Sequence, residues 1–167
     1  MHAETHTLMQ QLPHAQPETT MSLFKKILVP IDGSKTSDKA LDYALRIAQD
    51  SKGLVRLVHC IDEPYFLGSQ EYSGELMQIA RENGNRILQA GTTTAKAMGV
   101  AVDHVLIDRV AQRLGDSVAD AAGHWGADLI VIGTHGRRGI GRVLLGSGSE
   151  QVMRLSPVPV LMIRGFE

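Results

Sequence analysis

Apolar positions follow two alternating patterns from Lys26 onward. Five short, continuous apolar runs are typical of strands that are buried on both faces, and they span 26–32, 54–62, 100–108, 128–133 and 157–164. Between these runs, apolar residues recur every three or four positions, as on one face of a helix, at about 37–53, 76–99, 114–125 and 149–156. The pattern therefore predicts five strands that alternate with four helices.

The predicted helices carry recognisable start and stop signals. Ser34, Thr36 and Ser37 offer caps to the first helix, and Gly99 closes the second. Gly84 and Gly91 are expected to weaken the second helix locally. The stretch RVAQRLGD (109–116) gives mixed signals for the start of the third helix. One buried face is predicted for the second helix, formed by Leu76, Ile79, Ala80, Ile87, Leu88, Ala95 and Met98.

Strands that alternate with helices indicate one α/β domain. We predict a doubly wound, five-stranded parallel sheet of the flavodoxin-like or Rossmann-like kind, with strand order 3-2-1-4-5 and helices on both faces. Ligands of such sheets bind beyond the carboxyl ends of the strands, where the strand order reverses. The stretches VPIDGS (29–34) and IGTHG (132–136) each follow a strand, so they converge if strands one and four are neighbours.

Composition narrows the class of protein. The chain has 167 residues, 43% of them hydrophobic and 21% charged, which suits a single globular domain. A formal net charge of −1 gives no support to a nucleic-acid or membrane partner, and no apolar run approaches the length of a membrane span. The single cysteine, Cys60, fits a reducing compartment, so we expect a cytoplasmic location. Residues 1–21 contain no Lys or Arg and are predicted to be a disordered extension of a domain at 22–167.

Glycine is concentrated after the fourth strand. Six of the 17 glycines fall between Gly133 and Gly148, in the stretch IGTHGRRGIGRVLLGSGSE (132–150). The stretch does not match the dinucleotide fingerprint, because Leu144 stands where the third glycine belongs. It does not match the P-loop either, because Ser147 stands where the lysine belongs. No nucleophile elbow, paired cysteines or H-E-x-x-H spacing is present.

Two anion-binding elements remain at the ends of this stretch. Gly133 and Gly136 follow a strand, where backbone N–H groups can approach an anion closely. Gly146, Ser147, Gly148 and Ser149 precede or open a helix, whose N-terminus carries unsatisfied N–H groups and the positive end of the helix dipole. Two such elements at the ends of one loop favour a polyphosphate ligand.

The sequence at this point resembles the ATP-binding subgroup of the universal stress proteins. Their nucleotide signature, G-2x-G-9x-G-[ST], is complete in Gly133-TH-Gly136-RRGIGRVLL-Gly146-Ser147. The likeness covers about 22–164 and includes KKILVPIDGS, HCIDEP, GADLIVIGTHG and SPVPVLMIR in the same order.

The resemblance implies a role for each matching residue. Pro30, Asp32, the Cys60 backbone and Ile132 would line the nucleoside pocket, and Gly133 would lie near the ribose. The phosphates would be surrounded by Gly136, Gly146, Ser147, Gly148 and Ser149, with further contacts from His135, Arg137 and Arg138. The resemblance also implies ATP, AMP or ADP as ligand, Mg²⁺ or Mn²⁺ held by the phosphates, a homodimer through the last strand (158–163), and a regulatory protein partner that the sequence does not identify.

Several of these residues also have ordinary structural explanations. Asp32 could instead cap the first helix, and Cys60 could be a plain buried residue that contributes only its backbone. His135 could cover the loop, and the arginines at 137, 138 and 142 could form a solvated face. His59, His104, His124 and Trp125 are expected to be structural.

Three functions stay open at this level. The sequence favours a nucleotide-binding regulatory protein of the stress response. A slow Mg-dependent ATP hydrolase is the alternative, but the loop offers no P-loop lysine and no assigned carboxylate base. A nucleotide-independent interaction protein is the third. We predict no catalytic residue and no protein metal cage.

Overall fold

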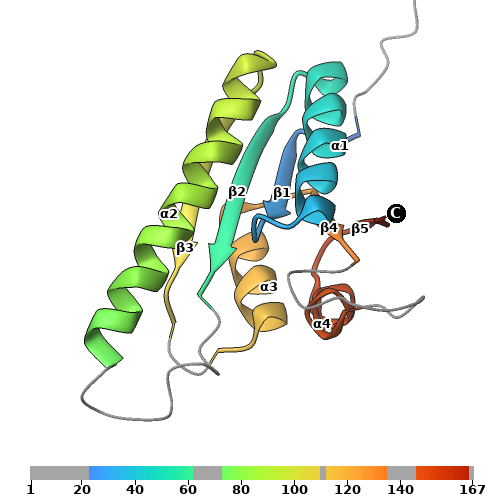
Figure 1. Cartoon of the computed structure of the whole chain (residues 1–167). Helices are drawn as coiled ribbons and strands as arrows, with labels where there is room; N and C mark the ends of the chain where they lie inside the picture. The colour runs from blue at the N-terminus through green and yellow to red at the C-terminus, as the bar shows by residue number, and fades with distance from the viewer. Residues whose placement is uncertain (1–22, 62–72, 110–111, 135–145, 166–167) are drawn as a thin grey trace, which may run out of the picture.

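Strands and helices alternate along the described chain as the apolar pattern predicts (Figure 1). The computed structural model describes residues 23–61, 73–109, 112–134 and 146–165. The predicted extension at 1–21 therefore lies outside the described residues. The elements are β1 (Lys26–Pro30), α1 (Lys35–Ser51), β2 (Leu54–Cys60), α2 (Ser73–Ala97), β3 (Ala101–Ile107), α3 (Leu114–Trp125), β4 (Leu129–Gly133), α4 (Ser147–Leu155) and β5 (Val160–Ile163).

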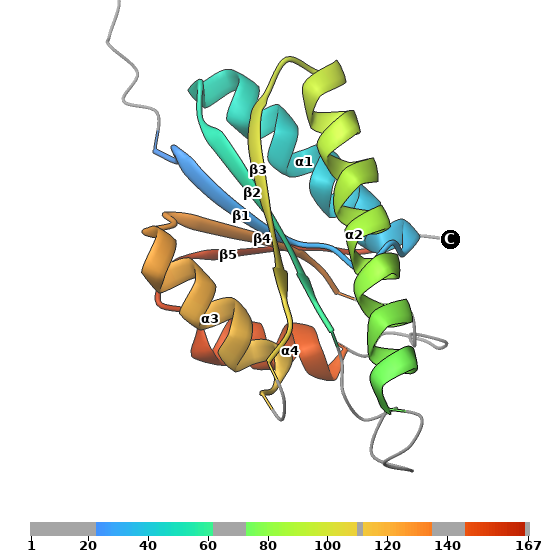
Figure 2. The same cartoon turned by 90° about the vertical axis from the view of Figure 1, so that its left-hand side faces the viewer.

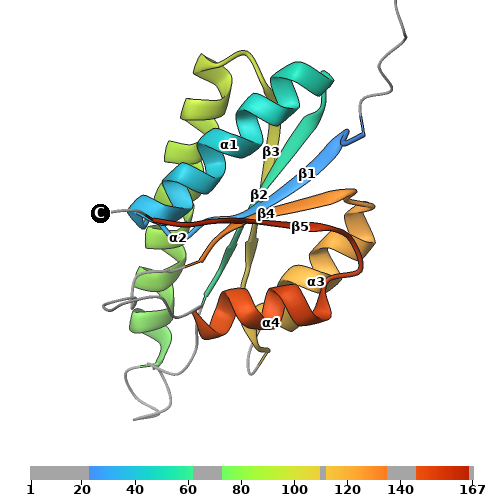
Figure 3. The same ribbon diagram turned by 90° about the vertical axis from the view of Figure 1, so that its right-hand side faces the viewer.

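The strands form one parallel sheet with the order β3-β2-β1-β4-β5, which confirms the predicted fold class. Helices α1 and α2 cover one face of the sheet, and α3 and α4 cover the other (Figures 2 and 3). The chain leaves β1 toward one face and β4 toward the opposite face. The order therefore reverses between β1 and β4, which are neighbours at the centre of the sheet.

Apolar side chains form a separate core on each side of the sheet. Ile27, Val29 and Ile31 face α1 and α2, whereas Leu28 packs with residues of α3 and α4 on the other side. This alternation follows the two-residue period of a strand. Consecutive residues at the carboxyl end of β1 therefore face opposite sides of the sheet.

Two predicted apolar segments are less enclosed than the sequence indicated. The strand β3 is an edge of the sheet and is only partly covered, with Val105 37% exposed. On α2, Leu88 and Ala95 are buried as predicted, but Leu76 and Ile79 are 41% and 51% exposed. The first turns of α2 extend past the end of β2 (Figure 1), so the predicted buried face was wrong at its N-terminal part.

Helix boundaries follow local hydrogen bonds. The Ser34 hydroxyl accepts a hydrogen bond from the Ser37 N–H at 3.2 Å and caps α1. Arg113 precedes α3 without a side-chain cap, which explains why the sequence around it gave mixed signals. The strand β5 begins only at Val160, because Pro157 and Pro159 cannot donate ladder hydrogen bonds.

The glycines of α2 allow the helix to approach the sheet. A Cβ atom at Gly84 would lie 2.6 Å from Leu106 Cδ1 and 2.7 Å from His59 Cδ2. At Gly91 it would lie 2.8 Å from Leu57 Cδ1. All three distances are shorter than any normal carbon contact, so close packing outweighs the low helix propensity of these glycines.

Candidate functional site at the carboxyl ends of β1 and β4

The two central strands, β1 and β4, stop pairing with each other before β4 ends. The ladder between β1 and β2 continues to Pro30 and Val58. The ladder between β1 and β4 stops earlier, at Leu28 and Ile130, although β4 continues to Gly133. The unpaired ends lie at the switch point of the sheet, where doubly wound folds bind ligands.

Pro30 accounts for this early end of the ladder. The Ile31 N–H donates to the Val58 carbonyl of β2 at 2.8 Å, so the backbone N–H of Ile31 points toward β2. Backbone donors alternate in direction along a strand, so the nitrogen of Pro30 faces β4. That nitrogen carries no hydrogen, and it cannot extend the β1–β4 ladder. A proline inside an apolar run was the available signal for this end of the ladder, in addition to the nucleoside contact that the resemblance implies for Pro30.

The N-terminus of α4 lies against the end of β4. The Gly146 N–H donates to the Thr134 carbonyl at 2.8 Å, which joins the two ends of the segment 135–145. Gly146 precedes the helix without a side-chain cap, and the Ser147 side chain is exposed. The first N–H groups of a helix lack partners within it and carry the positive end of the dipole. This end of α4 therefore has the properties of an anion-binding site.

Ser149 connects the two anion-binding elements. Its buried hydroxyl donates to the Gly133 carbonyl at 2.7 Å. A Cβ atom at Gly133 would lie 2.8 Å from Thr36 Cγ2 and 3.0 Å from the Thr36 carbonyl oxygen, so the end of β4 also packs tightly on the start of α1. Glycine is required at this position by packing inside the protein, whatever ligand binds there.

Asp32 orders the turn between β1 and α1. Its Oδ1 accepts a hydrogen bond from the Ser34 N–H at 2.9 Å, and its own N–H donates to Ser37 Oγ at 3.4 Å. Ser34, and not Asp32, is the residue that caps α1. Cys60 is half-buried at the carboxyl end of β2, beside this turn. These turns lie at the carboxyl ends of the strands. The residues found there are Pro30, Asp32, Cys60, Ile132, Gly133 and Gly146–Ser149.

Part of the predicted site lies outside the described residues. This holds for His135, Gly136, Arg137 and Arg138, and for Arg142 as well. Their predicted phosphate contacts stay predictions.

The other candidate residues have structural partners. His59 is buried, with its Nδ1 2.7 Å from the Ile31 carbonyl oxygen, and His104 Nδ1 lies 3.1 Å from Thr92 Oγ1. Trp125 packs under the guanidinium of Arg56, 4.6 Å from the ring centre. No group of His, Cys, Asp or Glu side chains suited to a metal occurs among the described residues. Nor does any helix among them reach the length and apolarity needed to cross a membrane.

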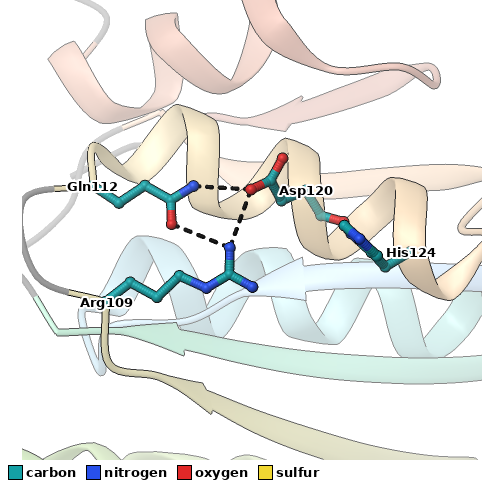
Figure 4. Close-up of polar contacts among 4 residues, drawn as sticks. All are labelled: Arg109, Gln112, Asp120 and His124. Carbon is teal, nitrogen blue, oxygen red and sulfur yellow. Dashed lines mark hydrogen bonds and ion pairs between the residues drawn. The ribbon is translucent and has the colours of Figure 1, made fainter.

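A polar cluster that joins α3 to the residues before it is also structural (Figure 4). Asp120 Oδ2 accepts hydrogen bonds from Arg109 Nη1 at 3.1 Å and from Gln112 Nε2 at 2.9 Å. His124 Nδ1 lies 2.7 Å from the Asp120 carbonyl oxygen. The Asp120 carboxylate is thus neutralised by Arg109, and the cluster ties the end of β3 to α3.

Two hollows are lined by described residues. One, of about 480 Å³, is between α3 and α4, next to Asp120 and Leu155. The other, of about 580 Å³, is between α1 and α2 and reaches Ile31 and Gly33, on either side of Asp32. Neither hollow is lined by Gly133 or by Gly146–Ser149, so the anion-binding end of the candidate site is defined by backbone geometry and helix polarity.

Sequence comparison identifies the family. The family model of the universal stress protein family matches residues 23–164. This chain belongs to the universal stress protein family. Universal stress protein MJ0531 of Methanocaldococcus jannaschii is 33% identical over 145 residues, which cover 86% of this chain and 84% of the relative. Universal stress protein YxiE of Bacillus subtilis is 29% identical over 151 residues, covering 85% of this chain and all of the relative.

Solved structures of universal stress proteins share the fold. The protein MJ0577 has a TM-score of 0.77 and 27% identity over 87% of this chain and 99% of its own. A family member from Burkholderia pseudomallei has a TM-score of 0.70 and 33% identity over 85% of this chain and 97% of its own.

Two further structures contain adenine nucleotides. The universal stress protein from Archaeoglobus fulgidus was solved in complex with dAMP, and it is 21% identical to this chain with a TM-score of 0.64 over 84% of this chain and 98% of its own. Another universal stress protein was solved in complex with cAMP, at 24% identity and a TM-score of 0.61 over 85% of this chain and 98% of its own. At these identities the two structures establish the shared fold. Their ligands are properties of those two proteins.

Proposed function

We propose that this universal stress protein binds an adenine nucleotide across the carboxyl ends of β1 and β4 and acts as a regulatory module. One observation carries the proposal: pairing between β1 and β4 ends at Leu28 and Ile130, at the switch point, next to the N-terminus of α4. This arrangement offers a nucleoside end and a phosphate end at the same end of the sheet. The complete G-2x-G-9x-G-S signature and the dAMP and cAMP complexes of the two universal stress proteins support the same ligand class.

The proposed orientation follows from the two ends of the site. The base and ribose lie over Pro30, Asp32, the backbone of Cys60, Ile132 and Gly133. The phosphates lie at the N-terminus of α4, beside Gly146, where Ser147, Gly148 and Ser149 supply N–H groups. Because the Ser149 hydroxyl already donates to Gly133, its phosphate contact would come from the backbone. ATP, AMP and ADP all fit this scheme, and Mg²⁺ or Mn²⁺ would be held by the phosphates.

We expect binding rather than rapid turnover. Ser147 replaces the lysine that a P-loop would supply. Asp32, at the nucleoside end, holds the Ser34 N–H and is not placed at the phosphate end. A regulatory role in the stress response, in the cytoplasm, is part of this proposal, and the single cysteine of the chain agrees with a reducing compartment.

A homodimer through β5 completes the proposal. β5 forms one edge of the sheet, and its Leu161 is 37% exposed. On the neighbouring helix α4, Met153 and Leu155 are 47% and 48% exposed. An apolar edge strand is stable when a second strand pairs with it.

Analytical ultracentrifugation tests the dimer. We expect the mass of a dimer for the wild type, and Leu161→Lys should reduce the mass to that of a monomer. A wild-type monomer at micromolar concentration would contradict the dimer.

The nucleotide proposal has a direct test. Nucleotide released by denaturing the purified protein is identified, and binding of ATP with Mg²⁺ is measured by calorimetry. Gly146→Ala/Ser147→Ala should weaken binding about tenfold or more, since it removes the exposed Ser147 hydroxyl and adds a Cβ at position 146, and one charge-assisted hydrogen bond to phosphate contributes about 1.5–3 kcal/mol. Gly123→Ala on α3, far from the site, serves as the control and should bind as the wild type does. If no adenine nucleotide is bound or released, the proposal fails.

The same preparation distinguishes binding from hydrolysis. ATP is followed over hours in the presence of Mg²⁺. ATP that stays intact on the protein supports the regulatory module. Turnover that disappears in Gly146→Ala/Ser147→Ala would establish the slow hydrolase instead.

A further inference from the structure

A second hollow of about 580 Å³ lies between α1 and α2, and we refer to it as the α1/α2 groove. Its volume is within the range of small-molecule sites, roughly 300–1,000 Å³. Its apolar lining includes Ile31 and Leu41, which are 5% and 4% exposed, and the half-buried Ile87. Small residues of α2, Ala90 and Gly91, leave the space open.

Opposite charges line the two helical walls of this groove. Asp38 lies in the first turn of α1 and Arg86 lies on α2, and both side chains are exposed. Neither forms an ion pair with any residue that the structure describes, in contrast to the neighbouring pairs Arg46–Asp42 and Arg81–Asp108. The half-buried Asn83 adds an amide on the α2 side. A carboxylate and a guanidinium that share one hollow without pairing can each bind the opposite charge of a ligand.

We propose that the α1/α2 groove binds a small zwitterion with apolar side chains, of the size of a dipeptide. The ligand's ammonium group would pair with Asp38 and its carboxylate with Arg86, with Asn83 as an additional hydrogen-bond partner. Its apolar side chains would cover Ile31, Leu41 and Ile87. A ligand with charge at only one end would leave Asp38 or Arg86 unpaired.

The groove adjoins the nucleoside end of the proposed nucleotide site. Its lining includes Ile31 and Gly33, which flank Asp32 in the turn after β1. The phosphate end lies on the other face of the sheet, where α4 packs beside α3 and opposite α1 and α2 (Figure 2). Binding in the α1/α2 groove is measured without nucleotide, so failure of this proposal and failure of the nucleotide proposal can be distinguished.

The experiment uses leucyl-leucine as the zwitterionic probe and N-acetyl-leucyl-leucine amide as its uncharged match. Amide shifts of the ¹⁵N-labelled full chain are followed during titration. For a ligand of this size we expect a Kd on the order of 0.1–1 mM, with shifts concentrated at α1 and α2. The capped peptide should bind at least about threefold more weakly, because two exposed ion pairs are lost.

Variants test the individual contacts. Arg86→Gln and Asp38→Asn should each weaken leucyl-leucine binding by roughly twofold to fivefold, and Ala90→Leu should abolish it by filling the groove. Arg154→Gln on α4 lies outside the groove and should leave the affinity unchanged. The shift spectrum of each variant also shows whether it is folded. Absence of binding up to 10-fold above the expected Kd, on the order of 10 mM, would overturn the proposal, as would equal binding of the capped peptide.

Discussion

The Ser149 hydroxyl donates a hydrogen bond to the Gly133 carbonyl at 2.7 Å, and thereby fastens the first turn of α4 to the end of β4. Both groups are buried. The neighbouring Ser147 is exposed in the same turn. Ser147 and Ser149 lie in the same helical turn but have different roles. Ser149 positions the helix N-terminus, and Ser147 is available to a ligand.

Ser149→Ala should lower the free energy of unfolding by about 1–3 kcal/mol, because the buried Gly133 carbonyl loses its hydrogen-bond partner. Urea unfolding followed by circular dichroism measures the loss. Ser147→Ala is the matched control and should change stability by less than about 0.5 kcal/mol, since the side chain is exposed. Equal stability of the two variants would show that the Ser149 bond contributes nothing.

Ser147→Asp should separate stability from ligand binding. A carboxylate in the first turn of α4 interacts favourably with the helix dipole, so stability should rise by about 0.3–1 kcal/mol. The same charge should repel phosphate and weaken ATP binding by more than tenfold. Thermal unfolding without nucleotide and calorimetry with ATP measure the two effects. ATP affinity equal to that of the wild type would place the phosphates away from α4.

Two helical glycines should respond to alanine with opposite sign. Gly91→Ala should cost about 1–3 kcal/mol, because its Cβ would lie 2.8 Å from Leu57 Cδ1 and 3.1 Å from Ile31 Cδ1. Gly123→Ala on α3 meets no atom within 4 Å and should stabilise by up to about 1 kcal/mol through helix propensity. Urea midpoints of both variants test this, and loss of stability in Gly123→Ala would contradict it.

Arg56→Lys should destabilise the protein by about 1 kcal/mol. Arg56 donates to both carboxylate oxygens of Asp103, at 2.7 and 2.6 Å, and stacks on Trp125, and lysine cannot reproduce this fork. The exposed pair of Arg46 and Asp42 provides the control, and Arg46→Lys should have almost no effect. Circular dichroism is the suitable measurement, because Trp125 fluorescence would itself change.

The hydrogen bond to Asp103 raises the pKa of Arg56, and the Asp103 charge acts in the same direction, against a smaller lowering by burial. A raised pKa in the folded state means that the stabilising contribution of the Arg56 charge is complete below the unfolded value. It is lost only when strongly alkaline pH passes the folded value. The difference between wild type and Arg56→Gln should therefore stay constant as pH rises from 7 to 10. A decline within that range would mean that Arg56 titrates there.

Much of the fold could be predicted from the sequence because its signals are local. Apolar runs and helical spacing gave every strand and helix that the structure describes, and the switch point followed from the alternation of strands and helices. The errors depend on tertiary packing. The exposure of Leu76 and Ile79 depends on where α2 ends relative to the sheet, and no local pattern encodes that.

The candidate site was predictable in its residues but not in its internal contacts. A glycine signature located Gly133 and Gly146, yet the contact of Gly133 with Thr36 joins residues about a hundred positions apart in the chain. The hydrogen bond between Ser149 and Gly133 likewise depends on how α4 crosses the end of β4. Such relations arise only when the sheet has assembled.

The only tryptophan of the chain, Trp125, closes α3 beside Lys26, the first residue of β1. It thus lies at the amino ends of the strands, whereas Pro30 and the N-terminus of α4 lie at their carboxyl ends. Intrinsic fluorescence of the wild-type protein should therefore report whether the domain is folded and respond little to an occupant of the nucleotide site. Thermal unfolding followed by Trp125 fluorescence can therefore measure the gain in melting temperature that an added ligand causes.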